Sequence, residues 1–189
     1  MFPKKTPIIV PWASSNRMER DLKYLGFKEV IPLKHGQSLK LDTDFELISY
    51  HIGYLGHVID SAVILKDRHT TLLNLNDSKF MGLPLKQILK KHKTIDFVFL
   101  SFSSANSRLS YEVMGGESML LDDLDRYIRN FHLFSRATGA RFTVPFASNH
   151  CYLHKDSFQY NEHGRTPRMV KDYWEKNKIE RPELKVMLS

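Results

Sequence analysis

An aspartate stands at the end of the most strand-like stretch of this chain. Residues 72–76 read Leu-Leu-Asn-Leu-Asn, and Asp77 follows them directly. Ligand-binding groups of α/β sheets gather where strands end, and a carboxylate there can bind a divalent metal. The competing interpretation is local, because Asn-Asp-Ser clusters commonly make turns or cap a helix through a residue such as Asp77 or Ser78.

Histidines could supply the nitrogen ligands of such a site. His57 stands in a glycine-flanked stretch that we expect to be a loop feeding the next strand, and His51 is an alternative six residues earlier. His150 and His154 follow a predicted strand over 141–146. Histidine is the commonest metal ligand near neutral pH, although a single loop histidine also serves as an ordinary surface or hydrogen-bonding residue.

Other chemistries find less support in the residues. Cys151 lies between two histidines, but the spacing matches no zinc finger or ribbon, so we expect a buried small hydrophobic residue. The serines in 101–107 follow a predicted strand without a Gly-x-Ser-x-Gly elbow, which favours a loop. The Gly115-Gly116 pair favours a turn, and the sequence contains no phosphate-binding loop and no His-x-His-x-Asp-His cluster.

Length and composition indicate a globular protein. The chain has 189 residues, of which 42% are hydrophobic, enough to bury a core, and we expect a single domain over 1–189 with a peripheral C-terminal tail or helix over 162–189. Its apolar runs are strand-sized, so no membrane span is expected. The N-terminus lacks a signal-peptide core and there is one cysteine, which together predict a cytoplasmic location.

The chain is basic, with a formal charge of +7 and a pI near 9.4. Its lysines and arginines are scattered, with short clusters at 90–93 and 165–171. Such runs usually solvate a surface, and an anion-binding face is the alternative. No nucleic-acid-binding motif accompanies the charge, so a nucleic-acid partner is not expected.

Alternating strands and helices predict the α/β class. A strand over 8–12 is followed by a helix that Gly26 ends, and short strands separated by turns then predict an antiparallel meander. The expected strands of the meander are 29–33, 38–41, 45–50, 61–66 and 70–75. The second half alternates helices and strands, predicted at 83–92, 95–101, 118–138, 141–146 and 166–176. A mixed sheet with helices on one face leaves an apolar face that needs a partner layer.

Several short segments resemble, in the same order, the C-terminal half of metallo-β-lactamase-fold proteins. The likeness is greatest to the branch with the hydrolase-like domain of CMP-N-acetylneuraminate hydroxylase and related bacterial proteins, and it covers roughly residues 6–161. The matching segments are 60–62, 73–77, 95–96 with 102–105, and 145–148 through His154 to Phe158 and Asn161.

The resemblance implies one half of an αββα sandwich, lacking the N-terminal half of the fold. In that half Asp77 matches the aspartate that bridges the metal ions and takes part in catalysis. His57 looks like the histidine that precedes this strand pair in many members, and His154 looks like the late histidine of the most similar branch. Ala147 occupies the more typical Pro-x-His position, and the His-x-His-x-Asp-His cluster has no counterpart here.

These implications predict a truncated or split metal-dependent hydrolase for a phosphoester or nucleotide-sugar type of substrate, with no activity expected from this chain alone. Its cofactor would be a divalent metal, zinc first and manganese or iron as alternatives, or none if the site stays incomplete. Its partner would be the missing half or a second copy of the chain. The alternative is a non-catalytic module that pairs with another chain.

Overall fold

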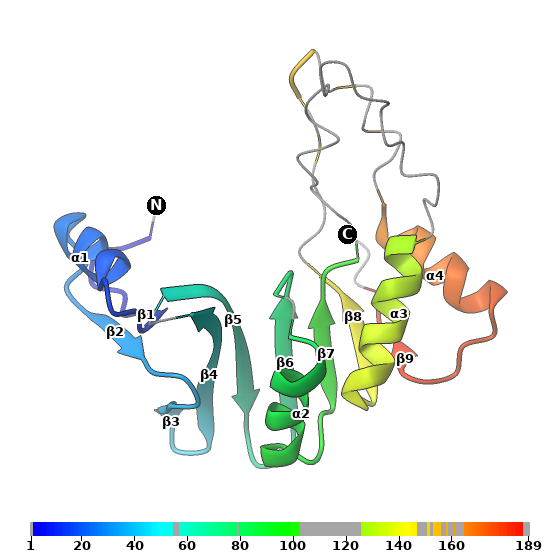
Figure 1. The fold of residues 1–189 in the computed structure, drawn as a ribbon, viewed down its shortest axis with the longest axis horizontal. Coiled ribbons are helices and arrows are strands. Elements are labelled where there is room, and N and C mark those ends of the chain that lie inside the picture. The colour runs from blue at the N-terminus through cyan, green and yellow to red at the C-terminus, as the bar shows by residue number, and fades with distance from the viewer. Residues whose placement is uncertain are drawn as a thin grey trace. The chain divides into compact units, whose positions relative to one another are not determined.

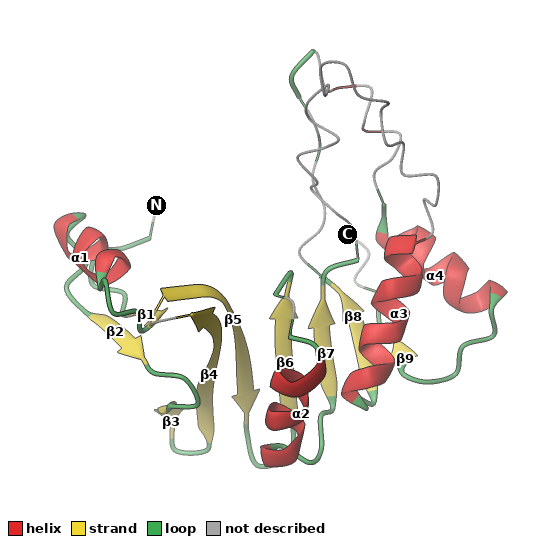
Figure 2. Ribbon diagram, viewed as in Figure 1, coloured by secondary structure: helices red, strands yellow, loops and turns green. Residues whose placement is uncertain are grey.

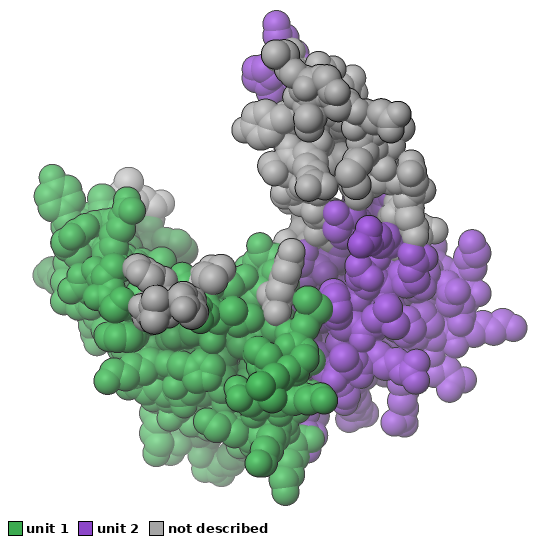
Figure 3. All heavy atoms as spheres, viewed as in Figure 1, with its two compact units in different colours: residues 1–93 green, residues 94–189 purple. Residues whose placement is uncertain are grey.

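The computed structural model describes residues 2–54, 57–78, 80–102, 126–146, 151, 153–155, 158, 161 and 165–186. The chain divides into two compact units, unit 1 over residues 1–93 and unit 2 over residues 94–189 (Figure 3). Each unit is described by itself. In the described residues, no helix is both long enough and apolar enough to cross a membrane.

Unit 1 begins with a strand, a helix and a second strand (Figure 1). They are β1 (Ile8–Pro11), α1 (Arg17–Tyr24) and β2 (Val30–Leu33), and Gly26 leaves α1 with a φ of 88°. The predicted first strand of the meander was wrong in its pairing, because β2 pairs in parallel with β1. A helix between two strands returns the chain to the starting end, so the second strand runs in the same direction as the first.

The predicted antiparallel meander is confirmed over four strands. These are β3 (Ser38–Asp42), β4 (Phe45–Tyr54), β5 (His57–Lys66) and β6 (Thr71–Asn76), each antiparallel to the next. The β4–β5 hairpin is longer than expected, because pairing continues from Glu46 opposite Lys66 to Tyr54 opposite His57. His57 is therefore the first residue of a strand, and its prediction as a loop residue was wrong.

One face of this sheet forms the core of unit 1. Along β6 buried and half-buried residues alternate, as expected for a strand with one buried face. The buried face carries Tyr50 and Leu73, and the helix α2 (Gly82–Lys91) buries Leu85 and Ile88. The Tyr50 hydroxyl is hydrogen-bonded to His92, the C-cap residue of α2, so this end of α2 lies on the Tyr50 face.

Unit 2 has parallel strands with helices packed beside them (Figure 2). The strands are β7 (Phe97–Leu100), β8 (Phe142–Pro145) and β9 (Glu183–Leu184). The helices are α3 (Arg126–Thr138) and α4 (Pro167–Lys176), and the Thr166 hydroxyl caps α4 by accepting a hydrogen bond from the Met169 amide. The part of the predicted helix over 118–125 lies outside the described residues.

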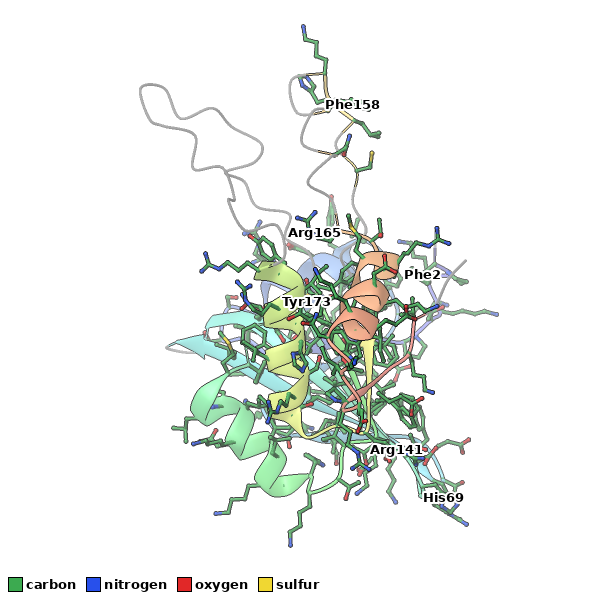
Figure 4. The ribbon with its side chains drawn as sticks, turned by 90° about the vertical axis from the view of Figure 1, so that its right-hand side faces the viewer. Phe2, His69, Arg141, Phe158, Arg165 and Tyr173 are labelled. Carbon is green, nitrogen blue, oxygen red and sulfur yellow. The ribbon has the colours of Figure 1, made fainter. Side chains whose placement is uncertain are left out.

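Aromatic side chains join α3 to α4. Phe131 of α3 is 1% exposed, and its ring lies 5.5 Å from that of Trp174 on α4. Tyr173 lies on α4 at the side of α3, with its ring 6.5 Å from that of His132 (Figure 4). Phe134, on the same helix as Phe131, is 36% exposed.

Mixed strand directions and flanking helices confirm the predicted α/β class. The first unit has one parallel pair, β1–β2, and an antiparallel meander, and the described strand pairs within the second unit are parallel. Two buried hydroxyls of unit 2, those of Ser135 and Thr143, lie 2.7 Å apart and join α3 to β8.

Candidate functional site

The candidate site lies at the end of the unit 1 sheet where β5 begins and β6 ends. The two strands are antiparallel with Val63 opposite Asn74, so these ends meet at one edge. Asp77 stands three residues after Asn74, and Asp60 stands three residues before Val63. The register therefore brings Asp60 and Asp77 to the same end of the sheet.

The turn after β6 leaves the Asp77 carboxylate available. The Asn74 side chain accepts a hydrogen bond from the Asn76 amide at 3.0 Å, and both the amide and the hydroxyl of Ser78 donate to the Leu75 carbonyl. Asn76 has a φ of 50°, which turns the chain sharply. Asp77 itself is exposed, with no hydrogen bond or ion pair from the described part of the chain.

Helix capping does not explain Asp77. The helix α2 begins at Gly82, its N-cap residue is Met81, and no side chain caps it. The turn interpretation holds for Ser78, whose hydroxyl is bonded to the backbone. Asp77 is thus a strand-end carboxylate, as the sequence predicted, without a structural partner among the described residues.

A β-bulge shapes the neighbouring start of β5. Ile52 pairs with Asp60 and Gly53 pairs with Val58, so Ile59 is an extra residue in β5. The Asp60 carboxylate accepts a hydrogen bond from the Ser61 amide at 2.8 Å. Bulges commonly re-aim side chains at sheet edges and beside functional sites. The sequence singled out 60–62 only as a matching segment, and the bulge left no pattern that could have revealed it.

His51, the alternative metal ligand, is held in a structural role. Its Nε2 lies 2.9 Å from the Ser49 hydroxyl, and its backbone amide donates to His35 Nδ1 at 3.0 Å. Burial lowers the pKa of His51, and the neighbouring His35 adds to the effect. The spacing of Ser49 and His51, two residues apart on one face of β4, was the sequence signal for this pair.

A second histidine of unit 1 is bonded to the core. His92 Nε2 lies 2.7 Å from the hydroxyl of Tyr50, which is 2% exposed. Burial lowers the pKa of His92, with Lys66 and Lys91 also lowering it and Glu46 raising it. Burial raises the pKa of the Tyr50 hydroxyl, so the neutral forms of both partners are favoured.

Acidification is expected to destabilise the chain through these histidines. A histidine whose folded pKa lies below its ordinary value of about 6.5 binds its proton better when unfolded, so stability is present above about pH 6.5 and is lost as pH falls. We expect the melting temperature to drop between about pH 7.5 and about pH 5.5, and His92→Gln to flatten that drop.

The matched control is His69, an exposed residue of an outlying turn (Figure 4). His69→Asn should keep the wild-type pH profile, because only the His69 backbone amide is bonded to Asp67. Differential scanning calorimetry across this pH range measures all three proteins. If the melting temperatures of the wild type and His92→Gln fall equally with pH, His92 does not contribute to the loss of stability in acid.

The remaining predicted site residues lie in unit 2. His154 is exposed, and whether it is a ligand stays a prediction. Cys151 is exposed, so its prediction as a buried small hydrophobic residue was wrong. His150, Gly115-Gly116 and 103–107 lie outside the described residues.

The described side chains do not make up a metal site. Wherever the structure describes side chains, no three His, Cys, Asp or Glu come together in a way that could hold a metal ion. The side chain of His57 is not among those described. Among the described side chains, Asp77 therefore has too few neighbouring donors for a catalytic metal, which normally has about three protein ligands.

Neither the family models nor the curated proteins match this sequence. Solved structures do match in fold. The CmlA β-hydroxylase E377D mutant is 13% identical, with a TM-score of 0.63, over 96% of this chain and 38% of its own. The isothiocyanate hydrolase from Delia radicum gut bacteria is 14% identical, with a TM-score of 0.57, over 98% of this chain and 66% of its own.

A third similar structure is the metallo-β-lactamase fold protein YhfI from Bacillus subtilis, which is 13% identical with a TM-score of 0.49 over 97% of this chain and 62% of its own. The chain thus spans less than two thirds of each of these proteins. The similar structures share one architecture, and the predicted resemblance is confirmed at the level of the fold. This chain has the fold of the metallo-β-lactamase-fold proteins.

Proposed function

We propose that this chain is the C-terminal part of a metal-dependent hydrolase that acts on a phosphoester or nucleotide-sugar type of substrate. In this proposal Asp77 binds the metal at the reacting centre and His57 is a second ligand. His154 of unit 2 is the third proposed ligand. Zinc is the first candidate metal, with manganese and iron as alternatives.

The observation that carries the proposal is the position of Asp77. Its carboxylate is exposed directly after β6, at the end of the sheet where β5 begins with His57. The turn uses Asn74 and Ser78 for its own hydrogen bonds and leaves Asp77 unused within the described residues. In α/β folds, ligand-binding groups lie at strand ends. A strand-end carboxylate that makes no hydrogen bond or ion pair with the described residues therefore supports a metal-binding role.

The proposal also requires donors from a second polypeptide. The described side chains of this chain assemble no site of three ligands, and the chain spans 38% and 66% of the first two similar structures. When bound, a divalent metal activates water for attack on an ester. Within the proposal, Asp77, His57 and His154 bind the metal, and the second polypeptide supplies the remaining ligands of the catalytic centre.

Complementation tests this function. The purified chain is mixed, with Zn²⁺, Mn²⁺ or Fe²⁺, with a polypeptide that carries the His-x-His-x-Asp-His cluster of a metallo-β-lactamase-fold protein. Bis(4-nitrophenyl) phosphate and a nucleotide sugar serve as probes. We expect no hydrolysis by either polypeptide alone and metal-dependent hydrolysis by the mixture. The proposal would be contradicted if this chain alone hydrolysed the probes as fast as the mixture does. It would also be contradicted if the mixture hydrolysed no probe with any of the three metals.

A non-catalytic interaction module is the second candidate, and the other face of the β4–β5–β6 sheet favours it. While Tyr50 and Leu73 point to the side of α2, alternate residues point to the opposite face, where the apolar side chains are only half-buried. The apolar residues of this second face are Leu39, Leu47, Val63, Leu65 and Leu72. An apolar sheet face of this kind gains stability under a second layer.

Self-association distinguishes this candidate. If a second copy covers the face, light scattering should give a dimer for the wild type and a monomer for Leu65→Lys, because a buried lysine without a partner opposes the contact. Lys66→Glu, an exposed change at the next position, is the control and should stay dimeric. A wild-type monomer that binds no apolar dye would count against the module.

A further inference from the structure

Unit 1 contains a cavity of about 580 Å³ that the proposed function does not use. Three segments line it, namely the stretch after β1, the helix α1 and the start of β5. Aliphatic side chains make most of its wall, including Met18, Leu22, Leu25 and Val58. The volume falls in the range of roughly 300–1,000 Å³ that small-molecule sites occupy.

The apolar side of α1 is available to a ligand. This helix has no buried residue, and Met18 and Leu25 are 54% and 58% exposed. Both side chains line the cavity together with Leu22, which lies between them on the same helix face. The hydrophobic contact that would stabilise α1 is therefore only partly made within the described residues.

The polar groups of the cavity leave one carboxylate without a cation. Asp21 faces Arg17 at 3.5 Å, and both residues line the cavity. Asp60 accepts a hydrogen bond from the Ser61 amide, but no described lysine, arginine or histidine forms an ion pair with it. One arginine against two aspartates gives the lining a net formal charge of −1, in a chain whose own charge is +7.

A bulge at Ile59 directly precedes the carboxylate that lines the cavity. In a regular strand, neighbouring residues point to opposite faces. Here Asp60 and Ser61 both line the cavity, as does Val58. Val58, Asp60 and Ser61 thus bring an acidic group beside the aliphatic wall at the bulged start of β5.

We infer that this cavity binds a small amphipathic organic cation. Its hydrocarbon body packs against Met18, Leu22, Leu25 and Val58, and its ammonium group lies at the Asp60 carboxylate. Charge complementarity selects a cation over an anion, because an anion would meet an unpaired aspartate. Neither Asp77 nor His57 lines the cavity, although Asp60 lies at the same end of the sheet as Asp77.

Three probes of equal length test the inference on the full chain, namely hexylammonium, hexanol and hexanoate. Chemical shifts of the Met18, Leu22, Leu25 and Val58 methyl groups are followed by NMR during each titration. We expect saturable shifts of these methyls with hexylammonium, binding up to about fivefold weaker with hexanol and weaker still with hexanoate, as for a partly exposed ion pair.

Two variants locate the charge. Asp60→Asn keeps the shape of the side chain and should make hexylammonium and hexanol bind equally, whereas Asp44→Asn, at an exposed ion pair with Arg68, should keep the preference. The inference is overturned if hexylammonium gives no saturable shift at these methyls, if hexanoate binds as well, or if Asp60→Asn retains the preference for the cation.

Discussion

Replacing Phe131 with alanine is expected to lower the free energy of unfolding by about 3–5 kcal/mol, which is a large share of the stability of a typical domain. Phe131 is 1% exposed, and its ring lies 5.5 Å from that of Trp174 and 6.5 Å from that of Phe102. Its removal leaves a cavity between α3 and α4. The variant loses both the free energy gained by burying the ring away from water and the packing contacts of the ring.

Phe134 offers a matched control on the same helix. It is 36% exposed, so Phe134→Ala should cost less than about 1 kcal/mol. Urea unfolding followed by tryptophan fluorescence measures both variants. If Phe131→Ala does not fold, Phe131→Leu keeps most of the volume and should cost about 1 kcal/mol. Equal losses for Phe131→Ala and Phe134→Ala would contradict the packing described here.

Replacing Asp77 with alanine is expected to lower hydrolysis by the complemented mixture at least about 100-fold. Loss of a residue that only supports a metal ligand typically costs about 10–100-fold, and loss of the ligand itself should cost no less. Since the side chains of Asn74 and Ser78 hold the turn, the variant should fold like the wild type. Circular dichroism checks the fold, and release of 4-nitrophenol measures the rate.

Asp172 supplies the control for the loss of a carboxylate as such. It is an exposed residue of α4, and Asp172→Ala should keep the wild-type rate. His154→Ala, measured in the same assay, tests the third proposed ligand separately. An Asp77→Ala mixture that hydrolyses the probes at the wild-type rate would remove Asp77 from the proposed site.

The sequence predicted the strands and helices whose own periodicity defines them. The alternation in β6 and the helical spacing in α1 and α4 are local patterns, and the structure confirms these elements. Pairing is not local, so the partner of β2 was predicted wrongly. The length of the β4–β5 hairpin was also missed, because Gly56 beside His57 indicated a loop, whereas cross-strand pairing continues to His57.

The candidate site likewise combines features that the local sequence determines with features that depend on strand pairing. Asp77 at a strand end could be predicted, since it follows an apolar run in the sequence. The bulge next to Asp60 depends on how β5 pairs with β4, and no residue pattern encodes it. Cys151 was expected to be buried because of its residue type, but the structure leaves it exposed.

Metal binding by the purified chain tests the central claim most directly. Equilibrium dialysis against Zn²⁺, Mn²⁺ and Fe²⁺, with metal content determined by mass spectrometry, is carried out on the wild type, Asp77→Ala and Asp172→Ala. The wild type and Asp172→Ala should bind at least one of these metals saturably, and Asp77→Ala should bind it at least about tenfold more weakly. No saturable binding by the wild type, or equal binding by Asp77→Ala, would contradict the claim that Asp77 is a metal ligand.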